Sequence, residues 1–167
     1  MGMSSEVSPF AVGPILRGLH LAIMTESNTT WDYKMSYQHP LRTTNIHLAS
    51  GQTVMTDAPQ DNHGLGQMFS PTDLLSTSLA ACVATIIGIH VNSKDYELIS
   101  IDANIQKKMA SQPRRVAAIK IDFIIEVSSV ASDQDLVLLE RSGRACPVAK
   151  SIHPDVVQDL SFTFKRA

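Results

Sequence analysis

The sequence is poor in the residues that mark several large protein classes. Its 167 residues include two cysteines, Cys82 and Cys146, too few for a disulfide scaffold. Fourteen Lys and Arg against sixteen Asp and Glu give a formal net charge of -2, so nucleic acid is not an expected partner. Neither cysteine has a CxxC partner and the six histidines show no HxxxH spacing, so no metal site is indicated.

The N-terminal region also lacks a run of apolar residues long enough for a membrane. The stretch from 10 to 24 is interrupted by Pro14, Arg17 and His20, which fits neither a signal sequence nor a span of about 20 apolar residues. No membrane partner is therefore expected, and the predicted location is the cytoplasm. In that reducing compartment, a pair of cysteines is either inert core filling or a redox group.

The remaining composition is that of one globular domain. Apolar residues make up 44% and charged residues 18% of the chain, with a mean hydropathy of +0.02. Residues 1–30 show no sustained periodicity and are rich in Ser, Thr, Gly and Pro, so they are interpreted as an N-terminal extension that need not be well ordered. Residues 31–167 are predicted to form a single domain.

Alternating apolar residues predict several strands. Short β-like patterns between 33 and 58 indicate two or three strands, followed by a loop without regular structure over 57–66. Two longer alternating segments, 99–106 and 119–127, are separated by a turn and predict an antiparallel hairpin. A last alternation at Leu160, Phe162 and Phe164 predicts a closing strand.

Two helices are predicted from capping signals. Ser70, Pro71 and Asp73 provide an N-cap, a proline at the first helical position and a capping-box acid, so a helix of about 20 residues should follow. Its predicted core face holds Leu75, Leu79, Cys82, Ile86 and Ile89, and its other faces are apolar enough to be mostly buried.

A second capping box at residues 132–135 predicts a helix with Leu136, Leu139, Gly143 and Cys146 along one side, ended or kinked by Pro147. The order of elements indicates an α+β fold with a mainly antiparallel sheet.

Residue type alone leaves both cysteines ambiguous. A lone cysteine in an apolar helix is most often a small core residue. Cys82 also lies about 16 Å along the axis from Pro71, too far for the helix dipole to ionise it. A reactive Cys82 would therefore need a neighbouring cation or hydrogen-bond donors, because the thiolate is the nucleophile.

Three segments together carry a resemblance to a known family. The sequence "SPTDLLSTSLAAC" ends at Cys82, "ACPVAKSIHP" surrounds Cys146, and "LRTTNIHLASGQTVMTDAP" lies upstream of both. They resemble the OsmC/Ohr family of osmotically inducible and organic hydroperoxide resistance proteins over roughly residues 33–166. The upstream segment looks like the OsmC-like branch.

This resemblance implies an OsmC-like fold, in which sheets wrap a long central helix, and an interleaved homodimer with active sites at the subunit interface. Cys82 would be the peroxidatic thiolate, oxidised by an organic hydroperoxide to a sulfenic acid, and Cys146 would then form a disulfide with it. The implied reductant is a dithiol, either a lipoylated protein or a thioredoxin-like donor, and no cofactor is implied.

The resemblance also implies an Arg and a Glu that hold the thiolate and orient the peroxide. Arg42 is the candidate cation, but the family Glu aligns with Thr72, and Asp73 is only its neighbour, about 100° away around the helix. Peroxidase activity is therefore expected to be weak or directed to another substrate. The alternative is a non-catalytic ligand-binding or redox-sensing dimer with an apolar interface cavity.

Overall fold

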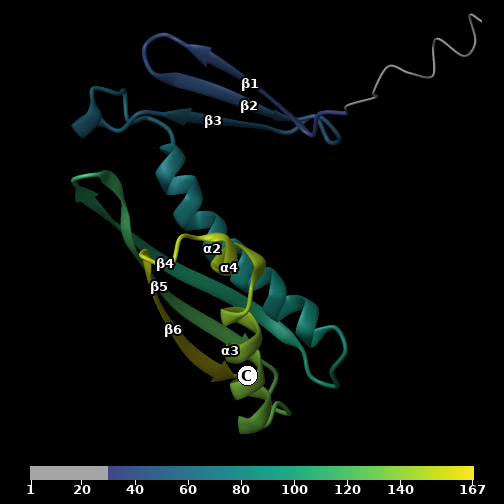
Figure 1. The fold of residues 1–167 in the computed structure, drawn as a ribbon. Helices are drawn as coiled ribbons and strands as arrows, with labels where there is room; N and C mark the ends of the chain where they lie inside the picture. The colour runs from purple at the N-terminus through teal and green to yellow at the C-terminus, as the bar shows by residue number, and fades with distance from the viewer. Residues whose placement is uncertain (1–29) are drawn as a thin grey trace, which may run out of the picture.

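A computed structural model describes residues 30–167 of the chain, so the prediction made for residues 1–30 lies almost wholly outside the described residues. Two three-stranded sheets and a long helix form the fold (Figure 1). The strands are β1 (Tyr33–Gln38), β2 (Arg42–His47), β3 (Thr53–Asp57), β4 (Leu98–Ser111), β5 (Arg114–Val127) and β6 (Val157–Arg166). The helices are α2 (Pro71–Val91), α3 (Asp133–Arg144) and α4 (Pro147–Ser151), with a 3-10 turn, η2, at Gln60–Asn62. The predicted α+β class is confirmed.

The N-terminal sheet is an antiparallel meander in the order β1-β2-β3, as the sequence predicted. The predicted loop over 57–66 is wrong in two places. Asp57 is the last residue of β3, where it faces Arg42 across the ladder, and residues 60–62 form η2. Figure 1 shows this sheet beyond the first turn of α2, and its strands make few contacts with the other elements.

The second sheet carries the hydrophobic core. Strands β4 and β5 form the predicted antiparallel hairpin around Gln112 and Pro113, and β6 pairs with β5 in parallel. The inward side chains of β5 are almost completely buried: Val116, Ile119, Ile121, Phe123, Ile125 and Val127. They pack against α2 and α3, so the core lies between this sheet and the helices.

Helix α2 begins as predicted, since Ser70 and Asp73 form a complete capping box and Pro71 occupies the first helical position. Its predicted core face is confirmed at Leu79, and Cys82 and Ile86 pack against the core, but the prediction is wrong at both ends of that face. The buried side is made by Ser76, Leu79, Ala80, Val83, Ile87 and Val91, whereas Leu75 and Ile89 are 38% and 59% exposed. Because α2 is apolar on all sides, periodicity could not select the face that meets the sheet.

Much of α2 is therefore uncovered within one chain. Among residues 30–167, α2 is the one helix long and apolar enough to cross a membrane by length and composition, and 33% of its most apolar window is buried. A core helix passes the same test. The prediction that α2 is buried on most sides is wrong for the single chain.

Helix α3 starts at the predicted second capping box, formed by Ser132 and Asp135. It ends at Arg144, two residues earlier than a helix carrying Cys146 would require. Cys146 instead caps α4, with Pro147 in the first helical position, so the proline begins a new short helix after the break. Gly143 and Leu139 are the buried residues of α3.

Candidate active site

The structure brings Cys82 and Cys146 together. Cys82 lies half-buried in the middle of α2 and Cys146 lies fully buried at the start of α4, and both are free thiols. The Cys82 thiol is near enough to Cys146 to be one of the groups that raise the pKa of the Cys146 thiol. Two thiols that are neighbours in this way are candidates for a disulfide bond.

Helix α3 packs closely against α2 at Gly143, shortly before Cys146. A Cβ atom added at Gly143 would lie 3.1 Å from Ile87 Cδ1 and 3.1 Å from Val83 Cγ1, so these two side chains would have to shift by a few tenths of an ångström to admit a larger residue. Cys146 follows Gly143 by three residues, and its backbone N–H donates to the carbonyl oxygen of Gly143 over 3.2 Å. Gly143 therefore both contacts α2 and accepts the hydrogen bond of the residue that carries the second sulfur.

The surroundings of Cys146 favour the protonated thiol. Its burial raises the pKa, and the neighbouring Cys82 sulfur raises it further; together they outweigh the lowering effect of the backbone N–H groups of Ala149 and Val148. The Ala149 N–H donates to Sγ over 3.3 Å. Cys146 therefore keeps its proton at neutral pH.

Arg42 is held by a carboxylate that the sequence analysis did not identify. Its Nε and Nη2 donate to the two carboxylate oxygens of Asp57 over 2.6 and 2.8 Å, and Nη2 also donates to Gln67 Oε1 over 2.9 Å. The Asp57 side chain is 0% exposed and that of Arg42 is 20% exposed. The hydrogen bond to Asp57 raises the pKa of Arg42, and the same bond lowers the pKa of Asp57, so both stay charged.

Arg42 is not joined to Cys82 within one chain. Its side-chain hydrogen bonds go to Asp57 and Gln67. The N-terminal sheet that carries it lies beyond the first turn of α2 (Figure 1), whereas Cys82 is about 16 Å further along that helix. The single chain therefore does not bring Arg42 to the sulfur pair.

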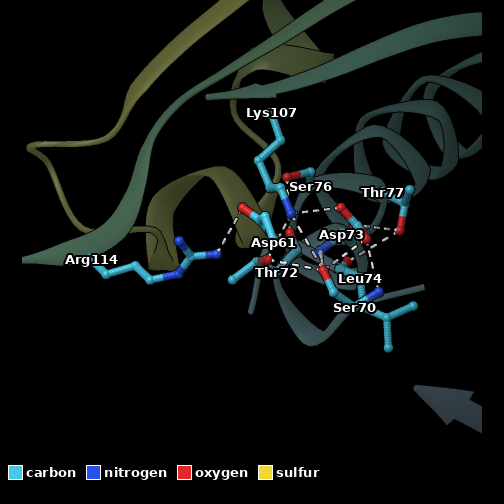
Figure 2. A network of polar contacts seen from close by, with 9 residues as sticks. All are labelled: Asp61, Ser70, Thr72, Asp73, Leu74, Ser76, Thr77, Lys107 and Arg114. Atoms are coloured by element: carbon cyan, nitrogen blue, oxygen red, sulfur yellow. Dashed lines mark hydrogen bonds and ion pairs between the residues drawn. The ribbon is translucent and has the colours of Figure 1, made fainter. Parts of the chain in front are cut away.

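Asp73 is engaged in a network of polar contacts at the start of α2 (Figure 2). Its carboxylate accepts from the backbone N–H of Ser70 over 2.8 Å and lies 2.7 Å from Lys107 Nζ. Burial alone would raise the pKa of Asp73, but the hydrogen bonds from Lys107 and Ser70 lower it overall. Lys107 also donates to the hydroxyl of Thr72 over 2.7 Å, so Thr72 and Asp73 share one cation that is not Arg42.

An apolar hollow of about 740 Å³ opens beside Pro147 and Val148 of α4, and the fully buried Cys146 does not line it. It lies between the start of α2, the start of β5 and the segment around α4, with Arg115 and His153 among its few charged or titratable neighbours. The apolar lining consists of Leu75, Val116, Pro147, Val148, Ile152 and Val156. Within residues 30–167, no three His, Cys, Asp or Glu side chains cluster as a metal site would require.

The sequence and the fold both match known proteins. The profile of the family described as "OsmC-like protein" matches residues 64–161. A Psychrobacter arcticus protein, provisionally described as an osmotic stress induced and detoxification response protein, is 42% identical, with a TM-score of 0.72 over 80% of this chain and 96% of that one. The chain belongs to the OsmC-like family. No curated protein matches the sequence significantly.

More distant members of the OsmC-like group share the fold alone. One is the organic hydroperoxide resistance protein OsmC of Legionella pneumophila, also described as a predicted redox protein and regulator of sulfide bond formation, at 15% identity and a TM-score of 0.57 over 80% of this chain and 97% of that one. OhrB of Bacillus subtilis, an organic hydroperoxide resistance protein, is 13% identical, with a TM-score of 0.55 over 80% and 98%.

Two residues of this OsmC-like site were missed by the sequence analysis. Asp57 was assigned to a loop, although its place at the end of an apolar strand could have suggested a paired position opposite Arg42. Lys107 gave no signal, because a lysine in an alternating strand usually reaches into water.

Proposed function

We propose that the protein is a thiol-dependent peroxidase that reduces organic hydroperoxides. The adjacency of Cys82 and Cys146 on α2 and α4 is the observation that carries this proposal. The family and the hydroperoxide resistance proteins that share the fold support the same chemistry.

The reaction begins with attack of the Cys82 thiolate on the outer oxygen of ROOH. The O–O bond breaks, Cys82 becomes a sulfenic acid, and the departing alkoxide takes a proton from solvent to give the alcohol. Cys146 then attacks the sulfenic sulfur, a disulfide forms and water leaves. A dithiol, lipoylated or thioredoxin-like, returns both thiols by exchange, in the cytoplasm where thiols are kept reduced.

The environments of the two cysteines support this division of roles. Cys146 is fully buried and its pKa is raised, so it is a poor first nucleophile and a suitable proton-bearing partner. Cys82 is the more exposed of the two and lies on the uncovered side of α2 near Ala81. An incoming peroxide therefore meets Cys82 first.

We further propose that the active protein is an interleaved homodimer in which Arg42 of one copy serves Cys82 of the other. Two unpartnered surfaces support this arrangement. One is the face of α2 that carries Leu75, Ala81 and Ile89; the other is the row of aromatic and apolar side chains along β1, formed by Trp31, Tyr33, Met35 and Tyr37, each at least 58% exposed. A second copy would bury both and bring the N-terminal sheet, with its arginine, to the sulfur pair.

The test is oxidation of the reduced full-length protein with cumene hydroperoxide, followed by intact mass and peptide mapping. We expect one equivalent of peroxide to give a Cys82–Cys146 disulfide, seen as a loss of about 2 Da per chain when two thiols become one disulfide. Cys146→Ser should stop at the Cys82 sulfenic acid and Cys82→Ser should not react. Absence of the disulfide in the unmodified protein would refute the proposal.

A second function is supported by the apolar hollow beside Pro147 and Val148. Its size falls within the range of small-molecule sites, and its lining is mostly apolar, so a non-catalytic dimer could hold an apolar ligand there. Redox sensing through the same cysteines is a variant of this idea. Binding of a fluorescent fatty acid that persists unchanged in Cys82→Ser, without peroxide consumption by the native protein, would favour this function.

A further inference from the structure

The contacts of Arg42 distinguish the two edges of its guanidinium. Nε and Nη2 are committed to Asp57 and Gln67, which together accept three hydrogen bonds between 2.6 and 2.9 Å. Among residues 30–167, nothing accepts a hydrogen bond from Nη1. One edge of the planar group is therefore held in place while the other is free to bind a further acceptor.

Asp57 is itself held firmly. Its Oδ2 accepts the backbone N–H of Gln67 over 3.0 Å, in addition to the bond from Arg42. Its own backbone N–H donates to the carbonyl oxygen of Phe69 over 3.2 Å. The carboxylate is thus tied both to the end of β3 and to the segment that leads into α2, and the orientation of Arg42 follows from this frame.

In the part of the chain that the structure describes, residues 30–167, no other acid pairs with Arg42. Asp73 is engaged by Ser70 and Lys107, and the hydroxyl of Thr72 also receives its hydrogen bond from Lys107 (Figure 2). A buried ion pair alone is weak evidence for stability, since desolvation offsets much of the attraction. Stability therefore does not explain the pair well. Orientation explains it better, because fixing one edge of the Arg42 guanidinium sets the direction of the edge that remains free.

We propose that Asp57 and Gln67 are positioning residues that orient Arg42, so that the free Nη1 edge meets the Cys82 sulfur and the peroxide in the other copy of the dimer. This inference rests on the proposed peroxidase function. Under this proposal, Asp57 at the end of β3 provides the carboxylate that Thr72 does not. The weak activity expected from Thr72 therefore does not follow, because Arg42 has a carboxylate partner of different origin.

The experiment is a double-mutant cycle on the rate at which reduced full-length protein is oxidised by cumene hydroperoxide, followed by rapid quenching and mass analysis. Asp57→Asn should slow oxidation about 10- to 100-fold, because a misdirected catalytic group loses rate on that scale. Arg42→Met should slow it at least as much. The double variant should react at the rate of Arg42→Met alone, because Asp57 acts only through Arg42.

The cycle separates a positioning role from a structural one. If Asp57 and Arg42 acted independently, the fold-losses in oxidation rate of the two single variants would multiply in the double variant. Gln67→Ala removes one exposed contact to Arg42 and should slow oxidation about 5-fold. If Asp57→Asn does not fold, the rate of Gln67→Ala tests whether the contacts of Arg42 position it. Asp61→Asn is the matched control, because it removes an exposed acid that pairs with Arg114 and should leave the rate unchanged.

Native rates in both Asp57→Asn and Gln67→Ala, or losses that multiply with that of Arg42→Met, would overturn the inference while leaving the peroxidase proposal intact. Failure of the unmodified protein to form the disulfide would instead refute the proposed function itself. A folded Asp57→Asn that slows oxidation in the native background, but causes no further slowing in Arg42→Met, would support the inference.

Discussion

Gly143 of α3 lies directly against Ile87 of α2, so closely that a methyl group on the glycine would come within 3.1 Å of Ile87 Cδ1. Both neighbouring side chains, Ile87 and Val83, are completely buried, and Val83 is β-branched and therefore stiff in a helix. These side chains would have to shift by a few tenths of an ångström to admit a methyl group, within a tightly packed core. This contact links the packing of the core to the spacing of the two cysteines.

Gly143→Ala should therefore destabilise the protein, although alanine is the better helix former. The gain in helix propensity is at most about 1 kcal/mol, whereas overpacking a dense core costs about 1–3 kcal/mol. Urea unfolding measures the balance, and peroxide-driven disulfide formation should also slow. Gly88→Ala is the matched control: the nearest atom to its new Cβ is Leu98 Cδ2 at 3.9 Å, so it should stabilise by up to about 1 kcal/mol. Equal effects at both positions would contradict this prediction.

The raised pKa of Cys146 predicts a loss of stability at alkaline pH. The folded state holds the Cys146 proton more tightly than the unfolded chain, where a thiol titrates near about 8.5. The resulting stabilisation is complete below that pH and is lost as pH rises through the higher folded pKa. In urea unfolding under reducing conditions, the stability difference between native protein and Cys146→Ala should shrink from pH 8 to pH 10. A difference that stays constant would mean that burial does not perturb this thiol.

Capping of the two helices offers a third prediction. Ser70→Ala removes the α2 cap and also contacts to Thr72 and Lys107, so it should cost about 1–2 kcal/mol. Ser132→Ala removes the α3 cap alone, in an exposed position, and should cost about 0.5–1 kcal/mol. Chemical denaturation of the two variants tests the order. A larger loss for Ser132→Ala would show that the network in Figure 2 adds no stability.

The sequence predicted those parts of the fold that depend on local signals. Both helix starts were identified because a capping box involves residues within four positions of each other, and the strands of the hairpin were identified from alternation. The buried face of α2 was not identified, because leucine, alanine and isoleucine occur on every side of it. Only the position of the sheet decides that Val83 faces inward and Ile89 outward.

The candidate site depended on contacts between distant segments. Cys82 and Cys146 could be proposed as a pair from the family resemblance, whereas the partner of Arg42 could not. Asp57 meets Arg42 only because the β2–β3 ladder pairs those two positions across a turn that contains Gly51, whose φ of 71° suits glycine. A shift of one residue in that register would turn the carboxylate to the opposite face of the sheet.

The last prediction concerns the uncovered face of α2. Ala81 is exposed in the single chain and lies next to Cys82, where the proposed dimer would bury it. Ala81→Glu should place a charge in that interface and yield a monomer, because an unpaired buried charge costs far more than the interface gains from one alanine. Light scattering with size-exclusion chromatography measures the mass, and Gln134→Glu on the exposed surface of α3 is the control for added charge. The monomer should also react slowly with cumene hydroperoxide, because its Cys82 would have no Arg42 from a second copy. A native protein that is itself monomeric, or an Ala81→Glu monomer with full activity, would show that each chain forms its site alone.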